Sequence, residues 1–273
     1  MDLLVNILII AVVLVLIYLF LIAPRMLHRA DRTPFLDWHY AHRGFFDNSS
    51  DAPENSLAAF QKAVDAGYGI ELDVQLSKDE KLVVFHDATL KRMCGVDGKV
   101  WDYTLEELQQ MKLLNSNETI PTFQQFLEVV DSKVPFILEF KLDRAQTRVC
   151  QYANEVLKNY KGAYCIESFH PLALMWYRKN RPDVMRGQLC EEFFRNKSYK
   201  GKPLFTLLSF LPFNFLTRPD FIAYNHKHAS NISRRICKAL GGLSVCYTVK
   251  NVEQYEKAKE NQFELIIFDS FRL

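Results

Sequence analysis

Glu71, Asp73 and His86 place two carboxylates and an imidazole in an otherwise apolar stretch of the chain. Such groups are costly to bury unless something binds them. Carboxylate oxygens are the ligands that hard divalent cations prefer, and an imidazole can accept or donate a proton. We therefore predict that the three side chains form one patch that binds a divalent metal ion. The alternative is a solvated outer face that carries ordinary charges.

The residues around this patch predict a hairpin of two short strands. Apolar and polar side chains alternate over residues 70–77, with the period of two that is typical of a strand. A polar turn and a second apolar run follow, and so short a connection cannot reach a parallel neighbour. If Leu76 pairs with Lys81, Glu71 lies opposite His86. Asp73, two residues after Glu71, then lies on the same face of the hairpin as Glu71 and His86.

Strands alternate with helices along the rest of the chain, which predicts a mostly parallel sheet. Their number, about eight, favours a closed (β/α)₈ TIM barrel over an open sheet. We expect strands near residues 38–41, 70–77, 82–85, 135–141, 163–169, 184–188, 221–224, 244–249 and 265–268, and helices near 57–66, 105–108, 126–130, 144–159 and 172–178. Asn55 is expected to cap the first of these helices.

More polar side chains stand where the predicted strands end, which is where a TIM barrel has its active site. His42 and Arg43 end one strand, and Glu139 and Lys141 end another. Together with the hairpin, three carboxylates could hold one Mg²⁺ or Ca²⁺ and leave positions open for a substrate. Two histidines could serve as general base and general acid, and the two cations suit an anionic substrate. This inventory suits cleavage of a phosphodiester. Structural histidines and a solvated ion pair are the ordinary alternatives, but the joint appearance at successive strand ends favours chemistry.

The composition excludes some classes of protein. The 273-residue chain has a net charge of +2 and a pI near 8.1, so no excess of positive charge points to nucleic acid. The cysteines form no C-x-x-C pair, so zinc-finger spacing is absent, and they suit small buried side chains in a reducing compartment. They are Cys94, Cys150, Cys165, Cys190, Cys237 and Cys246.

Residues 3–23 predict a single membrane-spanning helix, with Asn6 as its only strongly polar side chain. At about 1.5 Å per residue it is long enough for a bilayer core of roughly 30 Å. A cleaved signal peptide is the alternative, but the chain lacks a positive n-region before the apolar run. The basic residues that follow predict, by the positive-inside rule, that the C-terminal domain lies in the cytoplasm; they are Arg25, His28, Arg29 and Arg32. The sequons at Asn48, Asn117, Asn196 and Asn231 would matter only in the opposite orientation.

The motifs together resemble the glycerophosphodiester phosphodiesterase family. The resemblance rests on Ala-His-Arg-Gly at 41–44, Pro-Glu-Asn-Ser at 53–56, Glu-Leu-Asp-Val at 71–74, Val-Val-Phe-His-Asp at 83–87, Ile-Pro-Thr at 120–122 and Leu-Glu-Phe-Lys at 138–141. It covers roughly residues 38–273. It implies a TIM barrel with Glu71, Asp73 and Glu139 as metal ligands, His42 and His86 as the acid/base pair, and Arg43 and Lys141 near the phosphate.

The chain departs from the family pattern towards its C-terminus. Tyr247-Thr248-Val249-Lys250 stands where members often carry Trp-Thr-Val-Asn, and Phe268-Asp269 where a Thr-Asp pair is common. These differences concern the substrate-side wall more than the metal site. The apolar segment 203–215 either covers the barrel or touches lipid.

We expect a membrane anchor at 1–24, a linker at 25–37 and a phosphodiesterase domain at 38–273. The expected activity is metal-dependent hydrolysis of glycerophosphodiesters to an alcohol and glycerol 3-phosphate. One alternative is a lysophospholipase D that releases lysophosphatidate from lysophospholipids. The other is a catalytically idle, membrane-tethered binding barrel. The expected partners are the substrate and the membrane.

Overall fold

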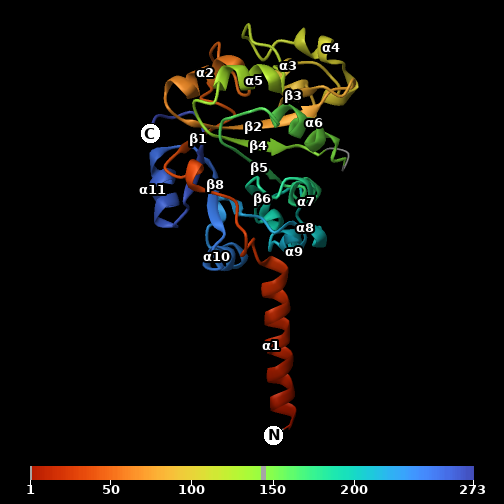
Figure 1. Cartoon of the computed structure of the whole chain (residues 1–273), viewed down its shortest axis with the longest axis vertical. Helices are drawn as coiled ribbons and strands as arrows, with labels where there is room; N and C mark the ends of the chain where they lie inside the picture. Colours follow the sequence, from red (N-terminus) through yellow and green to blue (C-terminus); the bar gives the residue numbers. More distant parts are fainter. Residues whose placement is uncertain (1, 143–145) are drawn as a thin grey trace.

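The structure, a computed structural model, describes residues 2–142 and 146–273, which form a closed parallel barrel with one long helix projecting from it (Figure 1). The parallel strands are β1 (His39–His42), β2 (Gly69–Leu76), β4 (Phe136–Phe140), β5 (Tyr164–Ser168), β6 (Arg186–Cys190), β7 (Phe221–Asn225), β8 (Leu243–Val249) and β9 (Leu265–Phe268). A further strand, β3 (Leu82–Val84), pairs antiparallel with β2. Pairing of β1 with both β2 and β9 closes the barrel. This confirms the predicted TIM barrel.

Helices connect the strands and cover the outside of the barrel. The longer ones are α2 (Leu57–Asp65), α5 (Phe123–Val130), α6 (Arg148–Leu157), α7 (Pro171–Asn180), α10 (Ile232–Ala239) and α11 (Val252–Glu260), and the short ones are α3 (Lys91–Cys94), α4 (Leu105–Gln109), α8 (Pro203–Leu208) and α9 (Asn214–Thr217). Local capping explains several of their starts: Thr122 and Gln125 form a reciprocal capping box at α5, which satisfies backbone donors that the helix cannot. The helix expected at 144–159 corresponds to α6, and its predicted start at Arg144 lies outside the described residues.

Alternation along the strands divides the side chains between two sides of the barrel wall. On β2, Ile70, Leu72 and Val74 are buried in the outer core beneath the helices. In that layer the Phe126 ring packs edge-on against Phe60 and Phe136, with centroids 4.8 and 5.2 Å apart. The opposite side of the same strand therefore faces the barrel interior.

The barrel interior is apolar near the N-terminal ends of the strands and polar near their C-terminal ends. Tyr40 and Ile137 belong to the inner apolar cluster, and His42 and Glu139 follow two residues later on the same strands. Position 69 requires glycine, because a Cβ there would lie 2.8 Å from the Tyr40 ring. Both β1 and β4 thus present an apolar residue first and a polar residue next, and this order positions His42 and Glu139 in the site.

The hairpin forms, but its predicted register is wrong by one residue. Leu76 pairs with Leu82 rather than with Lys81. The turn is longer than expected because Ser77 and Lys81 close it themselves: the Ser77 amide donates to the Lys81 carbonyl at 3.0 Å, and the Lys81 amide donates to Ser77 Oγ at 2.9 Å. His86 consequently lies beyond the paired part of the hairpin and reaches the site from a loop.

The projecting helix, α1 (Asp2–Ile22), has a mean hydropathy of 3.2 over Leu3–Ile22, and only 6% of that span is buried. Its length and composition suit a membrane span or a signal sequence. Ile22 itself is fully buried against the barrel domain. The segment that follows also packs against the domain, because the Arg25 amide donates to the Pro219 carbonyl at 2.8 Å and Phe35 joins the inner apolar cluster.

Candidate active site

A pocket of about 210 Å³ opens at the C-terminal ends of the barrel strands. Its lining includes six of the seven residues singled out in the sequence, and the seventh, Asp73, lies 3.0 Å from the Nζ atom of the lining residue Lys141. The full lining is His42, Arg43, Glu71, His86, Glu139, Lys141, Glu167, Phe169, Leu189, Tyr247, Thr248 and Ile267. The fold therefore brings all seven residues together from β1, β2, β4 and the loop after β3.

Glu71 and Asp73 of β2 and Glu139 of β4 form a buried acidic cluster. Their carboxylate oxygens lie within 4.8 Å of one another, and the three residues are 2%, 1% and 7% exposed. Burial and the neighbouring charges of Asp73 and Glu139 raise the pKa of Glu71 well above its ordinary value. Like charges held this close need a counter-charge. Three carboxylates are a donor set that fits a hard divalent cation such as Mg²⁺ or Ca²⁺.

Two cations adjoin the acidic cluster. Lys141 Nζ lies 2.6 Å from Glu139 Oε1 and 3.0 Å from Asp73 Oδ1. Arg43 Nε lies 3.5 Å from Asp73 Oδ2, while its Nη1 donates to Glu54 at 2.5 Å. Burial alone would raise the pKa of Asp73, but the nearby charges of Lys141 and Arg43 and the hydrogen bond from Asn55 act together with His86 to lower that pKa well below its ordinary value. The cluster and its cations form a polar layer that could bind both a metal ion and a phosphate.

A strained loop after β1 places Arg43 in the site. Arg43 has φ +56° and Gly44 has φ +84°, a region that non-glycine residues seldom adopt. A Cβ on Gly44 would also lie 2.9 Å from the Ala59 backbone, so the loop needs glycine there. The Arg43 amide donates to Glu71 at 3.2 Å. Strain of this kind persists where the surrounding structure overdetermines it, often at functional sites.

Asn55 belongs to the site and is not the helix cap, so that prediction is wrong. Ser56 caps α2 by accepting from the Ala59 amide at 3.1 Å. Asn55 adopts φ +58° and instead donates from Nδ2 to Asp73 Oδ2 at 2.9 Å. Its buried Oδ1 has no hydrogen-bond partner among the described residues.

His42 ends β1 between two carboxylates. Its Nε2 lies 4.0 Å from Glu71 Oε2, and its Nδ1 lies 3.6 Å from Asp269 Oδ1. Asp269 directly follows β9, the strand that pairs with β1. Burial and the charge of Arg43 lower the pKa of His42. The neutral imidazole, which can accept a proton, is therefore favoured.

His86 is oriented by a chain of ion pairs. Its Nδ1 lies 2.7 Å from Asp87 Oδ1, and Arg92 donates from Nε to Asp87 Oδ2 at 2.6 Å. Arg92 also donates to Glu54 at 2.6 Å, and Glu54 accepts from Arg43. One network thus holds both the imidazole of His86 and the guanidinium of Arg43.

We expect Asp87→Asn to lower kcat by roughly tenfold or more, a fraction of the roughly 10²–10⁴ that a whole acid/base group contributes. The amide would no longer hold His86 as a carboxylate does, and KM should change much less. The matched control is Asp97→Asn, because Asp97 is 87% exposed on the next loop and pairs with Lys91. Steady-state kinetics of both variants measure this. An unchanged kcat in Asp87→Asn would show that the ion pair does not orient a reacting group.

Glu167 is a buried site residue that the sequence reasoning did not single out. It lies on β5 beside Glu139 in the strand register, is 1% exposed, and has an Oε2 atom without a hydrogen-bond partner among the described residues. Burial and the charge of Glu139 raise its pKa well above the ordinary value. The alternation of side chains along β5 could have identified Glu167. It follows the inward-facing Cys165 by two residues, so its side chain points to the same side of the strand.

Aromatic residues form one wall of the pocket and continue away from it. Phe169 packs against Tyr247 with ring centroids 6.0 Å apart, and Tyr247 donates to the Cys190 carbonyl at 2.8 Å. Phe193 continues the row from Phe169 at 6.2 Å to Phe205 of α8 at 5.9 Å. An apolar surface therefore leads from the polar pocket towards α8.

Comparison with known sequences agrees with this geometry. A sequence profile of the glycerophosphoryl diester phosphodiesterase family matches residues 42–273. The chain belongs to this family. Its barrel, like its motifs, is that of the glycerophosphoryl diester phosphodiesterases, as the resemblance implied.

Two curated relatives illustrate the range of the family. The chain is 34% identical over 157 residues to a glycerophosphodiester phosphodiesterase of Bacillus altitudinis, covering 53% of this chain and 63% of that protein. It is 33% identical over 157 residues to the lysophospholipase D GDPD1 of Rattus norvegicus, covering 53% of this chain and 48% of that protein. The chain thus spans less than two thirds of the length of these relatives.

Solved structures share the fold over most of the chain. A phosphodiesterase of Oleispira antarctica, in complex with the product sn-glycerol-3-phosphate, matches with a TM-score of 0.69 and 25% identity over 86% of this chain and 93% of that chain. A glycerophosphodiester phosphodiesterase of Thermotoga maritima matches with a TM-score of 0.64 and 27% identity over 85% of this chain and 95% of that chain.

Proposed function

We propose that this protein is a metal-dependent phosphodiesterase that hydrolyses glycerophosphodiesters to an alcohol and glycerol 3-phosphate. The observation that carries the proposal is that three buried carboxylates, two histidines and two cations meet in or directly beside one pocket. Membership of the glycerophosphoryl diester phosphodiesterase family supports it. An idle binding barrel would have no need to retain two imidazoles beside a buried acidic cluster.

The residues divide into three roles. Glu71, Asp73 and Glu139 would hold the cation, which when bound would polarise a non-bridging phosphoryl oxygen. Lys141 and Arg43 would bind the phosphate oxygens through charge-assisted hydrogen bonds. Each of these five groups acts by binding or orientation, and none of them transfers a proton.

The two histidines would move the protons. One imidazole takes the proton of the attacking hydroxyl, and the other gives a proton to the departing alcohol oxygen. We expect the glycerol 2-hydroxyl to attack phosphorus, which forms a cyclic phosphate and breaks the bond to the alcohol. Water then opens the cyclic phosphate. Asp87 holds Nδ1 of His86, so Nε2 is the nitrogen that would exchange protons there.

A lysophospholipid is the second candidate substrate, and a specific surface favours it. The aromatic row from Tyr247 through Phe193 ends at α8, where Leu204 and Leu207 are 56% and 51% exposed. This apolar path could accept one acyl chain while the phosphate lies in the pocket. The product would then be lysophosphatidate. The relatives named lysophospholipase D are consistent with this candidate.

The substrate test compares lipids that differ in one group. The full chain in detergent should release choline from glycerophosphocholine or from lysophosphatidylcholine, whichever it prefers. It should leave diacyl phosphatidylcholine intact, because that lipid lacks the free 2-hydroxyl. The matched control is a lysophosphatidylcholine with a methylated 2-hydroxyl, which keeps the head group and the chain. Turnover of the methylated or diacyl lipid at a rate near that of the lyso form would contradict attack by the 2-hydroxyl.

We further propose that α1 is a retained membrane anchor and that the barrel domain lies in the cytoplasm, as the basic residues after α1 favour. Val12→Arg should make insertion less favourable by roughly 2.5–3.5 kcal/mol, the cost of arginine at a helix centre. Membrane fractions washed with alkaline carbonate should then hold much less of the variant. Val252→Arg on α11 is the control, because Val252 is 57% exposed on the barrel domain. Mature protein without residues 2–22 would instead identify a cleaved signal peptide.

A further inference from the structure

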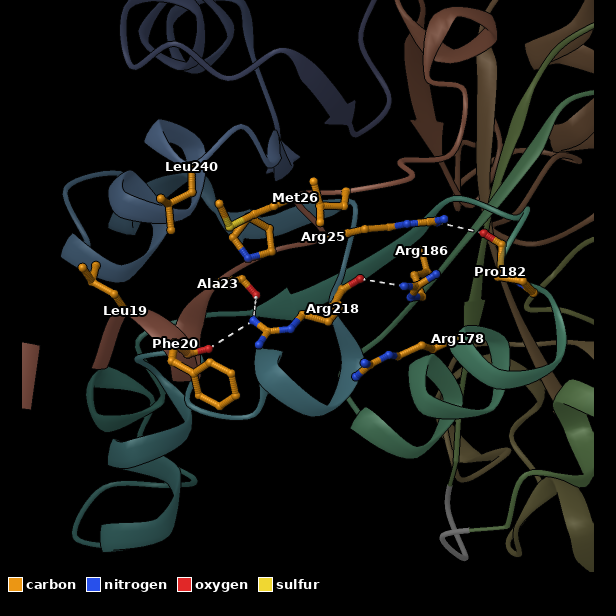
Figure 2. A pocket seen from close by; sticks show the side chains of 12 residues that line it. Leu19, Phe20, Ala23, Arg25, Met26, Arg178, Pro182, Arg186, Arg218 and Leu240 are labelled. Atoms are coloured by element: carbon orange, nitrogen blue, oxygen red, sulfur yellow. Dashed lines mark hydrogen bonds between the residues drawn. The ribbon is translucent and has the colours of Figure 1, made fainter. Parts of the chain in front are cut away.

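An open cavity of about 670 Å³ lies beside the end of α1 (Figure 2), and it shares no lining residue with the active-site pocket. Four arginines line it, and its described lining residues include no carboxylate. The lining is Leu19, Phe20, Ala23, Pro24, Arg25, Met26, Leu27, Arg178, Pro182, Arg186, Arg218 and Leu240. Apolar residues of α1 thus form one side of a cavity whose other side is strongly basic.

Backbone carbonyls hold the arginines in place without neutralising them. Arg218 donates to the Ala23 carbonyl at 2.9 Å and so caps the end of α1. Arg178 of α7 donates to the Leu216 carbonyl at 2.6 Å, and Arg186 of β6 donates from Nε to a carbonyl at 2.9 Å. Figure 2 shows that these side chains come from different segments and gather around one space. The cluster is therefore built by the fold and is not a run of neighbouring surface residues.

The positive charge of the cluster is poorly balanced. Among the described residues, Asp220 is the carboxylate within ion-pair distance, at 3.5 Å from Arg25 and 3.8 Å from Arg186. The buried Nη1 of Arg186, a residue only 2% exposed, has no hydrogen-bond partner among the described residues. Burial and the charges of Arg25 and Arg178 lower the pKa of Arg186 to about 10. A bound anion would relieve this repulsion.

The position of the cavity indicates where such an anion comes from. The apolar span of α1 ends at Ile22, and Leu19 and Phe20 of its last turns line the cavity. Leu27, just beyond, is 76% exposed. If α1 crosses the bilayer, as proposed above, this level is that of the lipid phosphates. A soluble anion would not need the apolar side of the cavity.

We propose that this cavity binds the phosphate head group of an anionic glycerophospholipid from the leaflet that adjoins the barrel domain. Planar guanidinium groups bind phosphate oxygens bidentately, and the lipid chains would lie along the exposed end of α1. The lipid would join α1 to α7 and β6 and so fix the orientation of the barrel at the membrane surface. This binding is separate from the phosphodiesterase reaction.

The test is native mass spectrometry of the full chain in detergent with phosphatidylglycerol, phosphatidylcholine or inorganic phosphate. Phosphatidylglycerol should form a one-to-one adduct that the other two do not. Arg178→Gln and Arg25→Gln should each weaken this adduct by roughly 10–100-fold, as expected for loss of a charge-assisted hydrogen bond. Arg235→Gln, which removes an exposed arginine of α10, should bind as the wild type does.

Several results would overturn the proposal. Equal binding of phosphatidylcholine would mean that charge does not select the ligand, and equal binding of inorganic phosphate would assign the cavity to a soluble anion. Equal weakening by Arg235→Gln would show diffuse attraction instead of a site. If a glutamine variant does not fold, Arg178→Lys keeps the charge and tests the bidentate geometry instead. This readout does not involve turnover, so its failure leaves the proposed phosphodiesterase activity untouched.

Discussion

Replacing His42 or His86 by alanine is expected to lower kcat for glycerophosphodiester hydrolysis by roughly 10²–10⁴-fold, the usual contribution of a general acid or base. Both imidazoles line the pocket, and each has its Nδ1 directed towards a carboxylate, Asp269 or Asp87. Attack on phosphorus and departure of the alcohol each need a proton transfer. The double variant should be little slower than the slower single variant, because groups that act as one unit are not additive.

His39→Ala is the matched control for these variants. His39 begins β1, the strand that His42 ends. It contacts Tyr255 at 3.4 Å and does not line the pocket. Its loss should leave kcat within a few-fold of the wild type. The rate at which alcohol is released from a soluble glycerophosphodiester is measured for the wild type and all four variants. If His42→Ala and His39→Ala behaved alike, a proton-transfer role for His42 would be untenable.

Replacing Glu139 by glutamine is expected to lower turnover by more than roughly 10²-fold. Loss of a residue that only supports a metal ligand already costs about 10–100-fold, and Glu139 would be a ligand itself. Glutamine keeps the shape but removes one of three charges from the acidic cluster. Excess cation should restore part of the activity if the variant binds the ion more weakly.

Glu128→Gln on α5 is the control, since Glu128 is exposed and lies outside the pocket. A chelator should abolish wild-type turnover, and added Mg²⁺ or Ca²⁺ should restore it. The same chelator series on the Glu139→Gln variant should show a higher cation requirement. Wild-type activity that a chelator leaves intact would refute the proposed role of the acidic cluster.

Much of the fold could be predicted from the spacing of apolar residues, because burial of one face of a strand or helix imposes that spacing. The alternation around Glu71 and Asp73 holds since one side of β2 faces the outer helices and the other faces the barrel interior. The barrel itself follows from strands that alternate with helices. The same logic, applied to β5, would have found Glu167, which stands beside Glu139 in the register.

Side-chain hydrogen bonds explain what the sequence could not predict. Ser77 lengthens the hairpin turn and moves the register by one residue. Ser56 takes the capping role and leaves Asn55 free to bind Asp73. Both outcomes depend on individual hydrogen bonds of polar side chains, and strand or helix periodicity carries no information about those bonds.

The residues that orient the histidines depend on tertiary structure. Asp269 reaches His42 only because β9 pairs with β1 at the point where the barrel closes. Glu54 in the loop after β1 accepts a hydrogen bond from Arg92 of α3, the helix that follows the His86 loop. Such pairs join segments that are distant in the sequence, so no local pattern marks them.

Cation-dependent turnover tests the central claim most directly. The full chain, stripped of metal and titrated with Mg²⁺ or Ca²⁺, is assayed in parallel for bound ion and for release of glycerol 3-phosphate from a glycerophosphodiester. We predict that activity rises with the binding of one ion per chain, and that Glu139→Gln loses both together. Full turnover in the metal-free protein, or ion binding that Glu139→Gln does not weaken, would contradict the account.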